Sequence, residues 1–423
     1  MKKMNRVILA GIFIILNGSL CAQEEKNDEI KVSPFQLTFI YPLGTNGILS
    51  KEYTHNFSLN LIAGYSGGLE GVELSGFAGH LKNDMKGVQL AGFSNSLLGV
   101  GDGVQLSGFS NFIRGNFKGV QISGFSNIVN ADAEATQISG FSNIIVGSVT
   151  GPQISGYINI VTQNSDYGQI SGFVNVTVAE SDGMQLAGFT NYSKGNNAGQ
   201  ITGFANVNTR DMKGVQLSGF ANVNTGKVDG VQLTGFVNYT QTINGVQLGV
   251  FNFVDSLESG IALGVLSFVK NGYSTFEISS GETLYGTVLF KTGLEGFYTM
   301  LGAGAAPRRG VLLWGWGFGL GTLIQTSANK NLGIEAISYH INEDEWFTNR
   351  VNLLNRLQLT HSWELSGRIS IFGGISWNVV VADNRDKSGN PLESSIFPWK
   401  VWEKNYGNTD VQMYPGFSAG FRF

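Results

Sequence analysis

The nine residues Gly119-Val120-Gln121-Ile122-Ser123-Gly124-Phe125-Ser126-Asn127 are one copy of a motif that recurs along about half of the chain. The copy at 87–95 differs from it only at the Ile and one Ser position. The Gln position can be followed through thirteen copies, from Glu73 to Ala262, at a spacing of about 16 residues. A repeat of this kind indicates an architecture in which each copy is one structural unit and neighbouring copies bury each other.

Two columns of amide side chains follow the repeat. Alternate residues of a strand point to opposite faces, so one face of a copy is apolar and small while the other carries Gln121, Phe125 and Asn127. If each copy is one coil of a β-solenoid, equivalent residues stack about 4.8 Å apart and the amides hydrogen-bond along the axis. The sequence therefore predicts two structural ladders. Their members are Gln89, Gln105, Gln121, Gln137, Gln153, Gln169 and Gln185, and Asn95, Asn111, Asn127 and Asn143.

A second architecture also satisfies the repeat. If each copy is one strand and one turn, the nine residues from Val120 to Ile128 nearly match the ~9–11 residues of a transmembrane strand. The repeats then form one large meander barrel whose Gln and Asn side chains line a polar lumen. However, the connectors between copies are of similar length, whereas bacterial barrels alternate short turns with long loops. This uniformity favours the solenoid and leaves the meander barrel as the alternative.

From about residue 273 the repeat is replaced by longer segments of alternating polarity. In 314–324 bulky apolar residues alternate with Gly, and in 411–423 apolar residues alternate with Gln, Ser and Arg up to the terminal Phe423. This alternation is typical of strands in an outer-membrane β-barrel. We therefore expect an all-β protein whose solenoid is joined to an antiparallel, outer-membrane-type β-barrel at 273–423. The segments 35–42 and 57–65 are candidates for two further barrel strands.

The first 22 residues have the form of a secretory signal peptide. Three cations precede the apolar run 7–16, which is too short to cross a bilayer as a helix, and small residues follow up to Ala22. The chain then divides into N-terminal strands or a cap at 23–70, the repeat region at 71–272 and the barrel at 273–423. Only 14% of the residues are charged and the net charge is −4. This charge balance argues against a nucleic-acid partner.

No catalytic or metal-binding motif is visible in the sequence. The histidines, His55, His80, His340 and His361, lack the spacing of a metal site, and no G-x-S-x-G nucleophile motif occurs. The single cysteine, Cys21, lies in the expected signal peptide. We therefore expect a protein that is not an enzyme and that uses no cofactor.

The copy Gly245-Val246-Gln247-Leu248-Gly249-Val250-Phe251-Asn252 resembles the repeat unit of surface-repeat proteins known from spirochaetes. The order of signal peptide, repeats and a region ending on an aromatic residue resembles uncharacterised outer-membrane proteins of Bacteroidetes. The resemblance implies location in the cell outer membrane, with outer-membrane lipid and the barrel-insertion machinery as partners. We expect a non-enzymatic surface protein whose repeats act as a scaffold or binding surface. The alternative is a pore or transporter whose repeat strands line a polar lumen.

Overall fold

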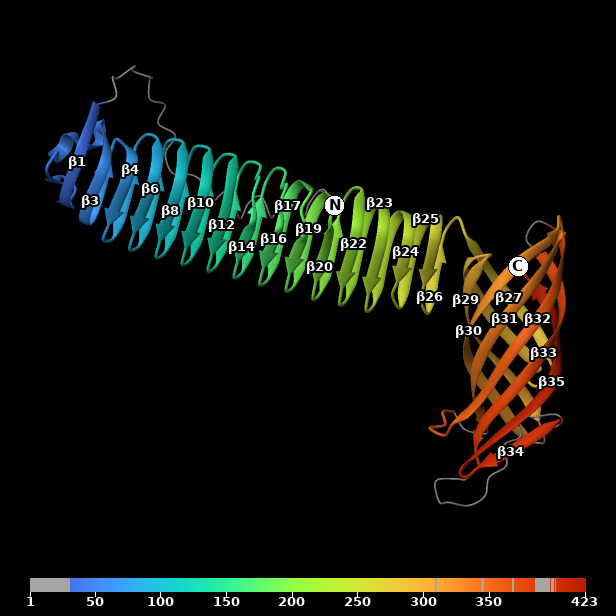
Figure 1. Ribbon diagram of the computed structural model, residues 1–423. Helices are drawn as coiled ribbons and strands as arrows, with labels where there is room; N and C mark the ends of the chain where they lie inside the picture. The colour runs from blue at the N-terminus through green and yellow to red at the C-terminus, as the bar shows by residue number, and fades with distance from the viewer. Residues whose placement is uncertain are drawn as a thin grey trace.

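The computed structural model of the protein describes residues 31–308, 310–343, 346–366, 369–384, 396, 399 and 401–423. They form an elongated rod and, at its C-terminal end, a curled sheet (Figure 1). The regular elements of these residues are strands apart from one 3-10 helix, η1 (Gly47–Glu52), so the all-β prediction is confirmed. No helix within this part of the chain has the length and apolarity needed to cross a membrane. The predicted signal peptide at 1–22 lies outside the described residues.

The rod is a parallel β-solenoid of about 14 turns over residues 54–269, which confirms the predicted solenoid and slightly exceeds the thirteen predicted copies. Successive turns pair in the register of the repeat, so that Gln121 lies between Gln105 and Gln137. The strands of this part are β1 (Lys31–Ile40), β2 (Leu43–Gly44), β3 (Tyr53–Ser66), β4 (Gly68–Ser75), β5 (Ala78–Leu81), β6 (Met85–Ala91), β7 (Ser94–Leu97), β8 (Gly101–Ser107), β9 (Ser110–Ile113), β10 (Phe117–Ser123), β11 (Ser126–Val129), β12 (Ala133–Ser139), β13 (Ser142–Ile145), β14 (Gln153–Ser155), β15 (Ile158–Val161), β16 (Gln169–Ser171), β17 (Val174–Ser181), β18 (Gln185–Ala187), β19 (Thr190–Asn196), β20 (Gly199–Thr202), β21 (Ala205–Asn208), β22 (Met212–Ser218), β23 (Ala221–Thr234), β24 (Val237–Leu248), β25 (Phe251–Leu263) and β26 (Leu266–Val269).

The meander-barrel alternative is wrong, because consecutive strands of a meander pair antiparallel and the repeats pair in parallel. The expected single strand from Val120 to Ile128 is also wrong. It consists of the end of β10 and the start of β11, separated by a bend at Gly124 and Phe125. Each turn therefore contributes one strand to each of two facing stacks, and the nine residues do not cross a bilayer.

The N-terminal strands belong to the rod. β1 pairs in parallel with β3, and β3 pairs in parallel with both β4 and β5. The segments 35–42 and 57–65, which were candidates for barrel strands, lie mostly in β1 and β3. Parallel pairing thus begins before residue 71, where the sequence motif first becomes recognisable.

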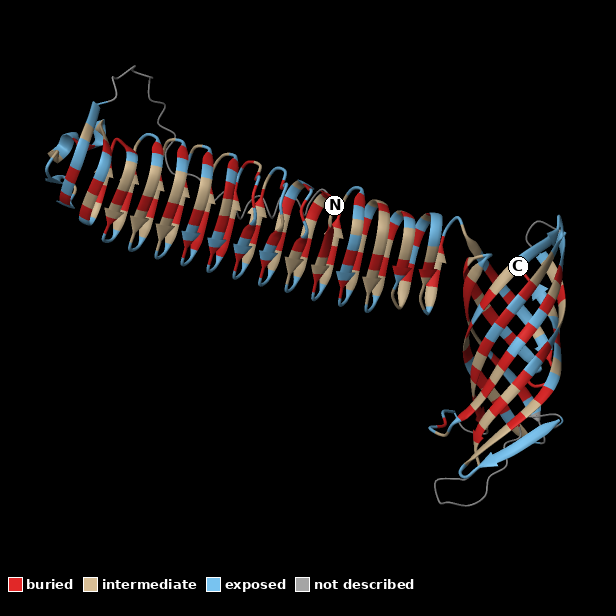
Figure 2. Ribbon diagram, in the orientation of Figure 1, coloured by how far each residue is buried: buried red, intermediate tan, exposed pale blue. Residues whose placement is uncertain are grey.

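The interior of the rod holds apolar and polar columns side by side. Phe117, Val129 and Ile145 are buried in an apolar cluster, and Gln121 and Asn127 are buried in the same turns. Figure 2 shows the buried residues as bands that recur in successive turns. Buried polar groups have to be hydrogen-bonded, so the amide columns constrain how the turns can stack.

The C-terminal part is a nine-stranded antiparallel sheet. β35 pairs with β33 on one side and, through Ser418–Arg422, with β27 on the other. Outward positions are exposed and apolar, as at Ile375 and Trp377, whereas the intervening Ser376 is buried. The strands are β27 (Tyr273–Gly281), β28 (Gly286–Leu294), β29 (Phe297–Arg308), β30 (Val311–Ser327), β31 (Lys330–Glu343), β32 (Asn352–Ser366), β33 (Ile369–Asp383), β34 (Trp402–Tyr406) and β35 (Thr409–Arg422).

The inward face of β30 is glycine because aromatic rings occupy the space beside it. A Cβ atom at Gly321 would lie 2.5 Å from Cε2 of Tyr298, and one at Gly317 would lie 2.6 Å from Cδ1 of Tyr339. Both tyrosines are almost completely buried. The alternation of bulky residues with Gly in 314–324 therefore reflects a crowded interior.

The rod and the sheet meet at one end of the sheet. Oγ1 of Thr292 donates a hydrogen bond to the carbonyl oxygen of Ser267 over 2.7 Å, and the rings of Phe268 and Phe290 lie 5.9 Å apart. Leu294 packs against the apolar core of the last turns. The sheet thus covers the final turn of the rod, whose interior would otherwise be open to water.

The substitution Gly124→Ala tests the close approach of successive turns at the bend. A Cβ atom at Gly124 would lie 2.1 Å from the carbonyl oxygen of Gly108 in the preceding turn. We expect the free energy of unfolding to fall by about 1–3 kcal/mol, the usual cost of overpacking, as measured by urea unfolding followed by circular dichroism. Gly168→Ala is the matched control, because its nearest neighbour would be 3.2 Å away. Equal losses in the two variants would contradict this account.

Candidate functional site

The Gln side chains form a continuous hydrogen-bonded ladder inside the rod. Each Nε2 donates to the side-chain oxygen of the residue one turn earlier over 2.6–3.0 Å, from Gln247 back to Glu73. A buried amide that loses its partner costs about 1–3 kcal/mol, so each turn holds its neighbour in register. The predicted members, all completely buried, are Gln89, Gln105, Gln121, Gln137, Gln153, Gln169 and Gln185.

The Asn ladder runs in the opposite direction. Nδ2 of each Asn donates to Oδ1 of the Asn one turn later over 2.9–3.1 Å, and the last, Asn252, donates to Oγ of Ser267 over 3.1 Å. The same nitrogen usually also donates to a backbone carbonyl, as Asn127 does to Ile138 over 2.8 Å. The side-chain dipoles of the two ladders therefore oppose one another. The predicted members, which are buried, are Asn95, Asn111, Asn127 and Asn143.

The Gln ladder ends on a carboxylate. Oε1 of Glu73 accepts from Gln89 over 2.9 Å, and Oε2 accepts from Ser66 over 3.4 Å. An ionised carboxylate only accepts, so it can end a chain of donors without needing a further acceptor. Burial raises the pKa of Glu73 to about 7, although the hydrogen bonds from Gln89 and Ser66 act to lower it. Within the described residues, Oε1 of Gln247 and Oδ1 of Asn95 have no hydrogen-bond partner.

The bends of the repeat carry a stack of aromatic rings on the outside of the rod. Successive rings from Phe77 to Phe236, with Tyr157 among them, lie 4.7–5.2 Å apart and close to parallel. Each ring is 37–52% exposed. Alternation along a single strand predicted Phe on the same face as Gln and Asn, but the bend turns the ring out of the interior. The rod therefore has a continuous aromatic edge.

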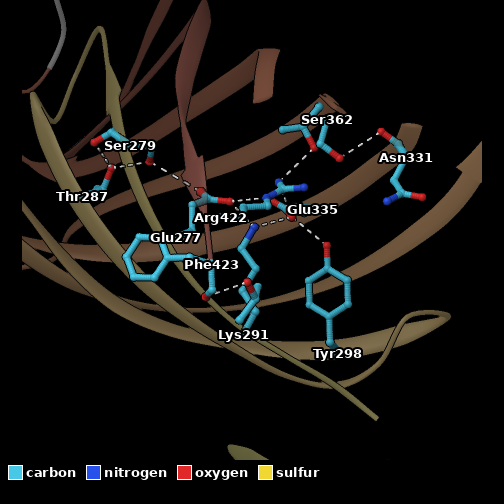
Figure 3. A network of polar contacts seen from close by, with 12 residues as sticks. Glu277, Ser279, Thr287, Lys291, Tyr298, Asn331, Glu335, Ser362, Arg422 and Phe423 are labelled. Carbon is cyan, nitrogen blue, oxygen red and sulfur yellow. Dashed lines mark hydrogen bonds and ion pairs between the residues drawn. The ribbon is translucent and has the colours of Figure 1, made fainter. Parts of the chain in front are cut away.

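A cluster of charged side chains lies inside the curled sheet (Figure 3). Nζ of Lys291 contacts the carboxylates of Glu277 and Glu335. Arg422 contacts the same two carboxylates, over 2.8 Å and 3.2 Å, and the Tyr298 hydroxyl donates to Glu335 over 2.7 Å. All four charged groups are at least 96% buried. Two cations balance two carboxylates, so the cluster is electrically neutral.

A second buried ion pair lies in the same interior. Nη2 of Arg356 is 2.8 Å from Oε1 of Glu282, and Nε of Arg356 donates to Oδ1 of Asn378 over 2.9 Å. The backbone N–H of Phe417 donates to Oε2 of Glu282 over 2.8 Å. Such hydrogen bonds satisfy the remaining charge of both groups, as a buried pair requires.

Neither cluster was predicted from the sequence. The charged residues are separate in sequence, and all but Glu282, which follows β27, stand at inward positions of their strands, as Lys291 does in β28 and Arg422 in β35. The available signal was a single charge in place of a small inward residue in an otherwise apolar segment. To predict which of these charges lie next to each other, one would need the register between the strands, and the sequence does not show it.

The predicted terminal residue, Phe423, lies beside β27. Its backbone N–H and C=O pair with Phe276 over 2.9 Å and 2.8 Å, and its side chain is exposed on the outward face. His55 and His80 lie in the rod, while His340 and His361 lie in the sheet. Within the residues that the structure describes, no three His, Cys, Asp or Glu side chains are placed to hold a metal ion.

Comparisons of the chain with family models, with curated proteins and with solved structures found no match. The resemblance to outer-membrane repeat proteins therefore stays a prediction. The features of the chain that bear on its function are the ladder-filled rod, its aromatic edge and the sheet with a charged interior.

The raised pKa of Glu73 predicts a pH dependence. Below the pKa of the unfolded state, 4.5, the carboxyl is neutral in both states; between 4.5 and about 7 only the unfolded state ionises, so stability falls as pH rises. The expected slope is about 1 kcal/mol per pH unit at its steepest. Burial lowers the pKa of His55 and His80, and this makes the stability of the fold rise with pH, opposite to the effect of Glu73. The two histidines are present in both proteins, so we compare the unfolding free energy of the wild type with that of Glu73→Gln at each pH. If the difference between the two is constant from pH 4.5 to 7, the pKa of Glu73 is not raised.

The buried cluster predicts a large cost for removing one cation. Lys291→Met leaves Glu277 and Glu335 with only Arg422, and we expect a loss of about 3–5 kcal/mol of unfolding free energy, measured by urea unfolding. Lys227→Met is the control, because it removes only solvent-exposed contacts with Asp229 and Glu258, and we expect a much smaller loss than for Lys291→Met. Similar losses for both lysines would show that the cluster is not desolvated.

Proposed function

We propose that the chain is an outer-membrane protein whose C-terminal sheet is a closed membrane-spanning β-barrel that anchors the rod. Two features support this proposal. β35 hydrogen-bonds to both β33 and β27, as its place in a closed barrel would require. Outward side chains are exposed and apolar along the strands, as at Ile375, Trp377 and Leu357. Such a surface is costly in water and expected in lipid.

The filled interior favours an anchor over a channel. Tyr298, Tyr339 and Tyr414 are buried inside the sheet, together with the two ion-pair clusters. Without β34, which pairs only with β35, the proposed barrel has eight strands, and eight-stranded barrels are just wide enough for side chains to fill them. The pore hypothesis also required repeat strands in the barrel wall, and the repeats form the rod. We therefore propose that this protein holds its rod at the membrane without conducting solutes.

The rod suits a non-enzymatic scaffold or binding surface. Its turns repeat the same outward side chains at about 4.8 Å, which presents a partner with many equivalent contacts along one axis. The interior amides are used in the ladders, so the surface columns are the part available for recognition. The observation that carries the whole proposal is the outward apolar face of the sheet, because it determines where the rod is held.

Placing a charge on that outward face tests the membrane anchor. Ile375 is 67% exposed, so Ile375→Arg should be nearly neutral if this face meets water. If it meets lipid, the free energy of unfolding in phospholipid vesicles should fall by up to about 2–4 kcal/mol. Val100→Arg is the control, because Val100 is an exposed apolar residue in a turn of the rod, and we expect a change within about 0.5 kcal/mol.

Two outcomes would count against the proposal. Equal, small effects of the two arginines would mean that the sheet does not lie in lipid. Discrete conductance steps of the purified protein in a planar bilayer would mean that the interior of the sheet is open, and would favour the hypothesis of a pore.

A further inference from the structure

The two ends of the proposed barrel differ in their connections. The end next to the rod has the short connections 295–296, 328–329 and 367–368, and the chain also ends there, at Phe423. The opposite end has the two-residue connection 309–310 and the longer connections 282–285, 344–351 and 384–408, the last of which includes β34. In outer-membrane barrels the short turns face the periplasm and the longer loops face the exterior. The barrel geometry therefore places the rod at the periplasmic end.

The same orientation limits what has to cross the membrane during insertion. Strands that enter from the periplasm carry only the connections of the far end across the bilayer, of which 384–408 is the longest. A rod at the far end would have to pass about 14 turns of backbone and buried amides through lipid. Both arguments rest on the membrane barrel proposed above.

The two long edges of the rod differ in polarity. In Figure 1 the arrows of β6, β8 and β10 point to one long edge of the rod, and the C-terminal sheet extends away from the rod on that same side. The Gly–Phe bends come directly after these strands, so they lie on this edge. The aromatic edge therefore faces the side on which the barrel crosses the membrane. The strands start near the other edge, where Lys86, Asp102 and Lys118 form a column of alternating charge. The aromatic column and the charged column thus lie on opposite edges of the rod.

Aromatic rings also connect the rod to the outward face of the barrel. Phe253 stacks on Phe268 at 5.2 Å, Phe268 lies 5.9 Å from Phe290 in β28, and Phe290 lies 4.9 Å from Phe276 in β27. Phe276 is 48% exposed on the face that we assign to lipid. The apolar surface of the last turns of the rod is therefore continuous with the lipid-facing surface of the barrel.

We propose that the rod lies along the periplasmic leaflet of the outer membrane, with its stacked Phe edge in the interfacial region of the phospholipids. Aromatic rings favour the membrane–water interface, and an amphipathic element there buries its apolar side by about 5–10 Å. An apolar edge this long is unusual on a soluble monomer, and lipid covers it without a protein partner. The charged edge then faces the periplasm and is the side free for recognition.

Depth-dependent fluorescence quenching tests this placement in the full chain. The sequence has one cysteine, Cys21, so a Cys21→Ser background accepts single labels. The positions are Phe220→Cys on the aromatic edge, Lys213→Cys near the charged edge of the same turn, and Ile375→Cys on the barrel. Phe125→Cys and Lys118→Cys repeat the rod pair in an earlier turn. Each bimane-labelled variant is reconstituted in phosphatidylethanolamine–phosphatidylglycerol vesicles that contain nitroxide-labelled lipids.

We expect lipid nitroxides to quench the labels at 375 and 220, and water-soluble iodide to quench the label at 213. Quenching at 375 with none at 220 and 125 would overturn the rod placement and leave the barrel intact; the Phe edge would then be open to a protein partner or a second copy. No quenching at 375 would overturn the barrel itself.

Protease added to intact cells tests the sidedness. We expect the rod to be cleaved only after the outer membrane is permeabilised, and cleavage of the rod in intact cells would overturn the periplasmic assignment.

Discussion

The rod depends on the burial of a Gln and an Asn amide in nearly every turn. An amide in a narrow interior has to find its partners along the axis, because the facing stack offers mainly apolar or equally committed groups. Gln121 is satisfied only when the turns on both sides are in register, and the same holds for Asn127. A slip by one residue would bury unpaired amides in every turn, so this constraint selects one register for the whole rod.

The ladders also explain why the ends of the rod are different from its middle. A chain of donors and acceptors has a free group at each end, and the end turns replace the repeated residue. The acceptor Glu73 ends the Gln column, and Ser267, held by Thr292 of the sheet, ends the Asn column. The sheet therefore has two proposed tasks: it completes the rod and it anchors it. Its own interior uses paired charges where the rod uses amides, and both solutions satisfy buried polar groups internally.

The sequence favoured the solenoid because the connectors of its 16-residue repeat are of similar length, but only the parallel pairing of the turns excluded the meander barrel. The sequence was not sufficient for the bend at Gly124 and Phe125, since alternation alone places Phe125 with Gln121 and Asn127. A Cβ atom added at Gly124 would lie 2.1 Å from the carbonyl oxygen of Gly108. This close contact exists only between stacked turns, so the sequence alone could not show why Gly is needed at the bend. The charged cluster was missed for a related reason. Glu277, Lys291, Glu335 and Arg422 come from four strands, and each looks like a single exception within its own segment.

The sequence by itself determined the all-β class, the repeat, the identity of the ladder residues and the outward apolar face of the C-terminal strands. These properties follow from periodicity, which acts between residues close in the chain. Only the tertiary structure decided that the Phe residues form an external edge, that two cations neutralise two carboxylates inside the sheet, and that the short connections lie beside the rod. Each of these depends on which distant segments become neighbours. Strand pairing sets that relation, and the local alternation of polarity leaves it open.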